Sequence, residues 1–300
     1  MNTVDSVLAG TARWGVACSD ALAFLRGLPT DAVDLVFCSP PYTIARTYGT
    51  GADLDSAAWA EWLRPIVVEA CRVSKCLAFF NVSDSVNDCA YGGGPEWLFA
   101  DLTRLDGIAA VRPYIWVKMH PQDEDAPNNG QPGSGGRHFH RNGYEPVYGF
   151  ADPAKLPPPW SDSTAFGKPP RYKSGGAMTQ RLKDGTRNNT GRMATLGMSG
   201  QPAVCNPGNV IKAIVGGGHL GHPLAHDSEA PMPLALAERF VCWFCPPDGI
   251  VLDPFAGSGT TCHAAFHHGR RFVGCDNRPS QIELIGRRMA TVTPSLFAGA

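Results

Sequence analysis

The chain has 300 residues, 43% of them hydrophobic, and a formal net charge of −1 at pH 7. This length and composition allow a sizeable buried core and exclude a disordered or fibrous protein. No run approaches the roughly 18 apolar residues that span a bilayer, and the N-terminus lacks the pattern of a signal peptide, so we expect a cytoplasmic protein. The ten cysteines are scattered through apolar segments, which predicts mostly buried free thiols rather than a disulfide framework.

The first half of the chain alternates between predicted strands and helices. Apolar runs predict strands that end at Cys18 and Cys38, with a helix through Leu28 between them. A long helical pattern follows, with Pro65 inside it as an expected kink. Three further apolar runs predict strands in the segments 76–84, 107–118 and 145–150.

The C-terminal third has the most regular pattern. Residues 249–277 predict a strand, a glycine-rich turn, a helix opened by Thr260 and Thr261, and a second strand ending at Asp276. Another helix is predicted over 279–289. Strands and helices that alternate at these lengths favour a mostly parallel sheet covered by helices on both faces.

Two segments interrupt this pattern. Residues 120–142 are rich in Gly, Pro, Asn and charge, which predicts a long mobile loop. Residues 151–205 are too long for a simple connection and contain eight basic against three acidic residues, which indicates an inserted module that binds a polyanion. On composition alone, a solvated surface without a ligand remains open for this insert.

The glycine-rich turn has the sequence DPFAGSG, from Asp253 to Gly259. Glycines after a strand let a ligand approach the backbone, and an acidic residue at the end of the next strand, here Asp276, can accept hydrogen bonds from ribose hydroxyls. The third glycine of a dinucleotide-binding loop and the lysine of a phosphate-binding loop are both missing. The pattern therefore predicts a ribose-bearing cofactor other than NAD or FAD.

DPFAGSG is similar to the S-adenosylmethionine loop of DNA amino-methyltransferases, and SPPY, from Ser39 to Tyr42, resembles their catalytic [DNS]PP[YFW] tetrapeptide. The order, with SPPY first and the cofactor loop near the C-terminus, resembles the permuted β subgroup. The resemblance implies a class I methyltransferase (Rossmann-like) α/β fold with a mixed seven-stranded sheet. It further implies a catalytic half at 1–150, a target-recognition insert at 151–205 and a cofactor-binding half at 206–300.

The resemblance also implies a site for S-adenosyl-L-methionine. Asp276 would bind the ribose, Asp253 would hold the loop or the cofactor's amino group, and Asp20 would lie near the adenine. The helix after His226 and Pro231 would close the pocket. The complete expected set is Asp20, Cys38, His226, Pro231, Asp253, Phe255, Ala256, Gly257, Ser258, Gly259, Thr260, Asp276 and Asn277.

The chemistry of amino methylation explains the SPPY sequence. An exocyclic amino group is a poor nucleophile, and fixed acceptors for its N–H groups can aim its lone pair at a methyl donor. We expect the Ser39 hydroxyl and the Pro40 carbonyl to be these acceptors, because Pro40 and Pro41 stiffen the turn. Tyr42 would offer its face to a base turned out of the duplex. Neither a metal nor a covalent nucleophile is required.

The expected substrate is double-stranded DNA. In the family that the chain resembles, serine as the first residue of the tetrapeptide leans toward N4 of cytosine, which the resemblance therefore implies here, with N6 of adenine as the alternative. Methylation at carbon 5 is disfavoured because the chain contains no Pro-Cys pair. The expected DNA contacts are Arg46, Tyr48, Lys168, Arg171, Lys173, Arg181, Lys183, Arg187 and Arg192.

Other functions remain open on the sequence. They are a DNA-binding protein that kept the fold without activity, and a methyltransferase for RNA or small molecules. A homodimer and a cognate restriction endonuclease as partner are also left open, as is the DNA sequence that would be recognised.

Overall fold

The computed structural model describes most of the chain and divides it into two compact units. The first unit is Met1–Asp162 with Gly208–Ala300, and the second is Ser163–Pro207. The described residues are 3–42, 56–83, 86–87, 90–91, 94–104, 107–121, 123–127, 143–168, 179–181, 187–189, 206–215, 220–227 and 231–294.

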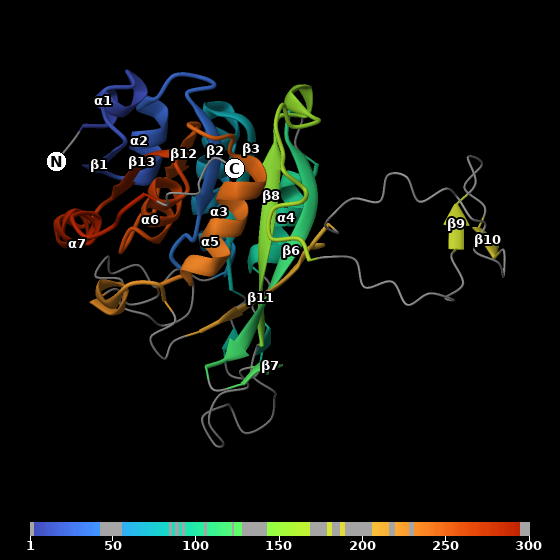
Figure 1. Ribbon diagram of the computed structural model, residues 1–300. Coiled ribbons are helices and arrows are strands. Elements are labelled where there is room, and N and C mark those ends of the chain that lie inside the picture. Colours follow the sequence, from blue (N-terminus) through green and yellow to red (C-terminus); the bar gives the residue numbers. More distant parts are fainter. Residues whose placement is uncertain are drawn as a thin grey trace. The chain divides into compact units, whose positions relative to one another are not determined.

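A nine-stranded mixed sheet forms the centre of the first unit (Figure 1). Eight strands lie in the order β1-β13-β12-β2-β3-β8-β6-β11, and β7 pairs with β6. The strands are β1 (Trp14–Cys18), β2 (Val33–Cys38), β3 (Ser74–Asn81), β6 (Ala109–His120), β7 (Asp123–Pro127), β8 (Tyr144–Ala151), β11 (Val210–Ile214), β12 (Ile250–Asp253) and β13 (Arg271–Asp276).

The strand directions decide which residues meet at each edge of the sheet. The strands β1, β13, β12, β2 and β3 are all parallel, whereas β8 runs antiparallel to β3 and to β6. The carboxyl ends of the five parallel strands and of β6 therefore lie at the same edge as the start of β8. The pairing of β6 with β8 shifts register between Val111 and Tyr114, around Pro113, which has no N–H for a ladder bond.

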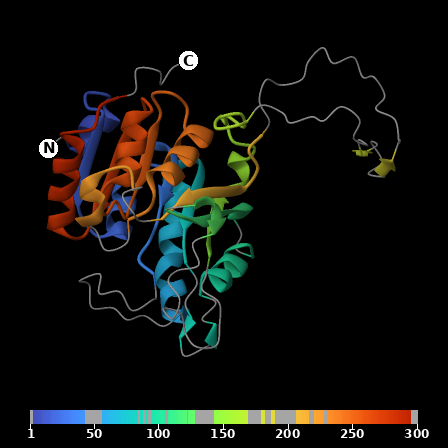
Figure 2. The same cartoon turned by 60° about the horizontal axis from the view of Figure 1, so that its bottom comes forward.

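Helices cover both faces of the sheet, as their apolar sides require (Figure 2). Val36 and Cys38 face a cluster that includes residues of α2 (Ala21–Gly27), α3 (Ser56–Val73) and α4 (Gly94–Leu102). Phe37, between them, stacks on Phe240 of α5 (Leu234–Phe244) with ring centroids 4.6 Å apart. The remaining helices are α1 (Val4–Leu8), α6 (Thr260–His267), α7 (Pro279–Met289) and the 3-10 turns η1 (Pro153–Lys155) and η2 (Pro223–Asp227).

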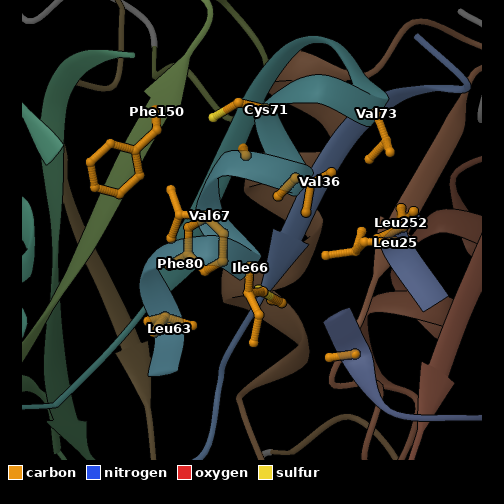
Figure 3. Packing of buried hydrophobic residues seen from close by; sticks show 14 of the residues in the cluster. Leu25, Val36, Leu63, Ile66, Val67, Cys71, Val73, Phe80, Phe150 and Leu252 are labelled. Atoms are coloured by element: carbon orange, nitrogen blue, oxygen red, sulfur yellow. The ribbon is translucent and has the colours of Figure 1, made fainter. Parts of the chain in front are cut away.

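Helix α3 supplies much of the larger core. Its residues Leu63, Ile66 and Val67 are each no more than 1% exposed and belong to one cluster with Phe80 of β3 and Phe150 of β8 (Figure 3). Burial of a side chain of this size stabilises the fold by about 1.5–3 kcal/mol. Pro65 lies inside the helix, as the sequence predicts.

The predicted fold class is confirmed, but the sheet has nine strands rather than seven. The expected loop 120–142 contains β7, an acidic strand that apolar periodicity cannot reveal and that pairs with β6 through Met119 and His120. Strand β11 and helices α1 and α4 are also absent from the sequence prediction. Each is short, and β11 follows directly on the irregular insert.

The expected insert begins earlier in the sequence than the second unit does. Residues 152–162 belong to the first unit, where the Lys155 ammonium pairs with Asp31 at 2.5 Å and donates to the carbonyl oxygens of Cys71, Arg72 and Ser74. Lys155, counted above with the basic insert, therefore stabilises the first unit.

The second unit contains one small antiparallel pair among its described residues, β9 (Thr179–Arg181) with β10 (Arg187–Asn189). Seven basic residues and a single acidic one, Asp184, lie in its sequence, whereas the whole chain has a net charge of −1. Positive charge is thus concentrated in the second unit. A further two-residue pair, β4 (Val86–Asn87) with β5 (Ala90–Tyr91), belongs to the first unit.

Candidate active site

The two motifs lie at neighbouring strand ends. Strand β12 lies between β13 and β2 in the sheet, and all three are parallel. The loop DPFAGSG begins at the end of β12, SPPY follows β2, and Asp276 ends β13. Carboxyl ends of parallel strands are where open α/β sheets bind ligands. The fold therefore brings a cofactor-type loop and the SPPY turn to one place.

Asp253 holds the glycine-rich loop. Its side chain is 3% exposed, and its two carboxylate oxygens accept hydrogen bonds from the Phe255 N–H at 2.9 Å and the Thr261 hydroxyl at 2.7 Å. Burial raises the pKa of Asp253 to about 7, with a further rise from the Asp276 carboxylate, and the two hydrogen bonds oppose this shift. Of the two roles implied by resemblance, this geometry favours holding the loop.

Asp276 joins the loop to β13. Its carboxylate accepts the Gly257 N–H at 3.0 Å, and its other oxygen accepts the Arg278 N–H at 3.0 Å. Gly259 has a φ of +78°, and a Cβ atom there would lie 3.0 Å from Ile285. A side chain is therefore disfavoured at Gly259 both by backbone conformation and by packing. A carboxylate beside a glycine turn fits a ribose-bearing cofactor.

A buried arginine that the sequence does not predict as a site residue donates hydrogen bonds to the same loop. Arg288 of α7 is fully buried and donates to the Ser258 carbonyl at 3.0 Å, the Thr260 hydroxyl at 3.1 Å and the His263 Nδ1 at 3.1 Å. Burial lowers the pKa of His263 to about 3, and the Arg288 charge adds to this, so the imidazole is neutral and accepts. Burial lowers the pKa of Arg288 to about 10.

Three other expected cofactor residues lie at this edge. Asp20 caps helix α2 by accepting the Ala23 N–H at 2.9 Å, and it follows β1, the neighbour of β13. Cys38 is fully buried at the end of β2, where burial and then Asp253 and Cys275 raise the pKa of its thiol. Asn277 follows Asp276, and its carbonyl accepts from the Cys18 thiol at 3.8 Å. The remaining loop residues, Ala256, Ser258 and Thr260, are buried within or directly after the turn.

The segment expected to close the pocket contains η2 and leads into helix α5. His226 is exposed in η2, and Pro231 precedes α5. Helix α5 lies on the face of the sheet, where Phe240 contacts Phe37 and Phe79. Among the described residues, no hydrogen bond or ring contact joins His226 or Pro231 to either motif. The apolar side of this helix packs on the sheet, and closure of the cofactor pocket by this segment stays a prediction.

The SPPY turn is held by side chains on two sides. The Trp59 indole of α3 donates to the Pro41 carbonyl at 2.7 Å, whereas the part of the chain that the structure describes forms no hydrogen bond to the Pro40 carbonyl. The Ser39 hydroxyl and the Tyr42 hydroxyl are 2.9 Å apart, and Tyr42 donates to the Glu145 carboxylate at 3.0 Å. The turn is thus fixed from helix α3 through Trp59 and from strand β8 through Glu145.

Glu145, Lys118 and Asn81 are site residues that the sequence reasoning missed. Glu145 is 5% exposed at the start of β8; one oxygen pairs with Lys118 at 2.7 Å, and the other also accepts from Asn81 at 3.1 Å. Lys118 lies near the end of β6, and Asn81 ends β3. Polar residues at three strand ends were the available signal, but only the pairing of β8 with both neighbours shows that they meet.

Few of the expected DNA contacts fall on described residues. Lys168 is exposed in the second unit, and the backbones of Arg181 and Arg187 are paired in the register of β9 and β10. The others lie outside the described residues: Arg46, Tyr48, Arg171, Lys173, Lys183 and Arg192. Within the described ranges, no group of three or more His, Cys, Asp or Glu side chains could hold a metal ion. A search of the same ranges shows no helix with the length and apolarity of a membrane span.

Comparison with known proteins identifies the family. The family described as DNA methylase matches residues 33–287. The type II methyltransferase M.BglII of Bacillus subtilis is 26% identical over 275 residues, covering 88% of this chain and 66% of that protein. The DNA adenine methyltransferase YhdJ of Escherichia coli K12 is 26% identical over 284 residues, covering 90% and 80%. This chain thus spans about two thirds of the first relative and four fifths of the second.

Solved structures share the fold. The PvuII DNA methyltransferase (cytosine-N4-specific) superposes with a TM-score of 0.64 at 17% identity, covering 92% of this chain and 86% of that one. TTHA0409 of Thermus thermophilus, determined with S-adenosyl-L-methionine, superposes with a TM-score of 0.56 at 22% identity, covering 93% and 94%. From the extent of the family match, together with the two motifs at one sheet edge, we conclude that the chain belongs to the DNA methylase family.

Proposed function

We propose that this chain is an S-adenosylmethionine-dependent DNA methyltransferase that methylates N4 of cytosine bases turned out of the duplex. The observation that carries the proposal is the adjacency of SPPY and DPFAGSG at the ends of β2 and β12. An enzyme that methylates a DNA amino group needs hydrogen-bond acceptors for that group beside its methyl donor. SPPY and DPFAGSG are proposed to supply the acceptors and the cofactor loop.

Different residues of the chain have different roles in the proposed reaction. When bound, S-adenosylmethionine supplies a methyl group activated by its sulfonium. Asp253 and Arg288 keep the loop in shape, and Asp276 is placed to accept hydrogen bonds from ribose hydroxyls. Ser39 Oγ and the Pro40 carbonyl accept the two N–H groups of the target base, and Trp59 keeps the turn from rotating by holding the Pro41 carbonyl.

The second unit is proposed to recognise the target sequence. Its seven basic residues against one acidic residue suit a surface that neutralises phosphates. The first unit, by contrast, is left acidic, which would repel a polyanion in the absence of the second unit. Within this scheme Lys168, Arg181 and Arg187 are proposed to contact the DNA backbone.

Cytosine is proposed over adenine because Ser39 begins the tetrapeptide. The structural neighbour with a TM-score of 0.64 is named as cytosine-N4-specific, whereas the Escherichia coli relative is named as an adenine methyltransferase. Adenine N6 therefore remains the second candidate, since the same two acceptors suit either amino group.

The decisive experiment is methylation of mixed-sequence DNA, followed by digestion and nucleoside analysis. We expect N4-methylcytosine; N6-methyladenine would establish the second candidate, and 5-methylcytosine alone or no methylated base would refute amino methylation. Ser39→Ala should retain cofactor binding and lose turnover by roughly 100-fold or more, as expected for loss of one preorganised polar partner.

A further inference from the structure

Four side chains, from strands β6 and β8 and from the SPPY turn, form a chain of hydrogen bonds that ends at Ser39. Lys118 pairs with one carboxylate oxygen of Glu145, and Tyr42 donates to the other. The Ser39 hydroxyl then lies 2.9 Å from the Tyr42 hydroxyl. Glu145 is 5% exposed, so these contacts are shielded from water and are strong.

The direction of each hydrogen bond follows from the number of protons available. As partner of an ammonium group, the Glu145 carboxylate is ionised, and an ionised carboxylate only accepts. A phenol has one proton, and Tyr42 gives it to Glu145. The proton between Ser39 and Tyr42 must therefore come from Ser39, which leaves Ser39 Oγ with lone pairs only.

We propose that Glu145 is a positioning residue that forces Ser39 to act as a hydrogen-bond acceptor toward the amino group of the target base. This inference rests on the proposed function and specifies how Ser39 performs it. A serine hydroxyl is ordinarily free to rotate and can present either its proton or its lone pairs. An amino group offers N–H donors, so an outward serine proton would repel it.

Lys118 and Asn81 have supporting parts in this arrangement. The Lys118 ammonium, 2.7 Å from Glu145, stabilises the charged carboxylate in a buried position. Asn81 is fully buried and donates to the same oxygen as Tyr42, at 3.1 Å, which fixes the carboxylate's orientation. Lys118 and Asn81 lie near or at the ends of β6 and β3, and Glu145 lies near the start of β8. The pairing of these strands therefore brings together the groups that orient the Ser39 proton.

Glu145→Gln tests the proposal directly. An amide keeps the size of the side chain, but its NH2 group facing Tyr42 would donate, turn the Tyr42 proton toward Ser39, and push the Ser39 proton toward the substrate. We expect kcat at saturating DNA and S-adenosylmethionine to fall by roughly 100-fold. The cofactor Kd and the DNA KM should stay within about threefold of the wild-type values, because neither ligand's other contacts change.

Tyr42→Phe separates this role from a structural one, because it retains the ring and removes only the hydroxyl. The single substitution should lower kcat by roughly tenfold, since Ser39 becomes free to rotate rather than wrongly oriented. Adding Glu145→Gln to Tyr42→Phe should then change kcat by less than about twofold, because the path to Ser39 is already broken. Thermal unfolding of each variant establishes that it is folded when assayed.

The outcomes are distinct. Wild-type turnover in the Glu145→Gln variant, or penalties of the two substitutions that multiply in the double variant, would overturn the proposal. If the wild-type protein itself places no methyl group on a DNA amino nitrogen, the proposed function fails first. If the wild type is active and only the variants behave otherwise than expected, the role of Glu145 alone is refuted.

Discussion

The Trp59 indole N–H lies 2.7 Å from the carbonyl oxygen of Pro41 and donates to it, which ties helix α3 to the turn that follows β2. Trp59 is 3% exposed, so this bond is shielded from solvent. Trp59, a member of the buried core cluster, therefore also fixes the backbone of the proposed catalytic turn.

Trp59→Phe should reduce both turnover and stability. Phenylalanine keeps most of the packing but leaves the Pro41 carbonyl without its donor, at a cost of about 1–3 kcal/mol. We expect kcat to fall by roughly tenfold, because the turn gains freedom. Trp62→Phe is the matched control. The ring centroids of Trp62 and Phe255 are 5.7 Å apart, but among the described residues the Trp62 indole donates no hydrogen bond to the turn. Equal losses of kcat in both variants would contradict this role.

Asp276→Asn should weaken cofactor binding. The amide oxygen can still accept from the Gly257 N–H, which keeps that contact to the loop, but the oxygen that accepts from the Arg278 N–H and the charge that would bind ribose hydroxyls are lost. We expect the Kd for S-adenosylmethionine to rise about tenfold or more, measured by isothermal titration calorimetry. Asp5→Asn, at an exposed position in α1, should leave the Kd unchanged. An unchanged Kd for Asp276→Asn would refute the ribose contact.

Arg288→Met should destabilise the protein. The substitution removes donors from the Ser258 carbonyl, the Thr260 hydroxyl and the His263 imidazole, all beneath the cofactor loop. We expect the free energy of unfolding in urea to fall by about 3 kcal/mol. Its neighbour Arg287 is exposed, and Arg287→Met should change stability by less than about 0.5 kcal/mol. Similar losses for the two variants would show that the buried contacts contribute little.

Asp253 should make stability depend on pH. Its pKa is raised from 3.8 to about 7 in the folded protein, so the folded state holds a proton that the unfolded chain releases between about pH 4 and 7. The contribution of this group to stability therefore falls as the pH rises through that range. His263 acts oppositely, since its pKa is lowered from 6.5 to about 3 and the unfolded chain binds the extra proton.

Asp253→Asn isolates the first of these effects. The amide keeps an acceptor for the Phe255 N–H and removes the titration. The free energy of unfolding can be measured by urea unfolding at about pH 4.5 and pH 7. Its change from the lower to the higher pH should be more positive for the variant than for the wild type. Parallel pH profiles for the two proteins would show that Asp253 does not titrate in this range.

Removal of the second unit should separate DNA binding from cofactor binding. Replacing residues 163–207 with a short flexible linker spares Lys155, whose ion pair with Asp31 belongs to the first unit. We expect the shortened protein to bind S-adenosylmethionine with about the wild-type Kd but to lose methylation of duplex DNA by roughly 100-fold or more, since most phosphate contacts would be gone. Retained methylation of duplex DNA would instead show that the second unit is not needed for DNA binding.

The sequence was informative where the determinants are local. Buried parallel strands appear as continuous apolar runs, and the glycine and proline turns after β12 and β2 have a backbone chemistry that a short segment specifies. The acid at Asp276 was recognisable because a single β-α-β unit sets its distance from the loop.

Interactions between distant segments were not recognisable. Glu145, Lys118 and Asn81 meet only because β8 pairs with both β3 and β6, and no spacing in the sequence encodes that register. The sequence pattern places Arg288 near the end of an amphipathic helix, where an arginine is usually exposed. Only the structure shows that it is buried against the cofactor loop. Lys155 was grouped with a basic insert because charge counting cannot detect an ion pair made 124 positions away, as with Asp31.

The first unit completes its own hydrogen bonding on each side of the second. Before the junction, the Asp162 N–H donates to the Trp243 carbonyl at 2.9 Å; after it, the Asn209 side chain donates to the Pro113 carbonyl at 2.9 Å. Neither anchor depends on the residues between 163 and 207. The whole intervening segment can therefore be exchanged without loss of either anchor. On the proposed function, such an exchange would change the DNA sequence that is recognised and leave the residues proposed for methyl transfer in place.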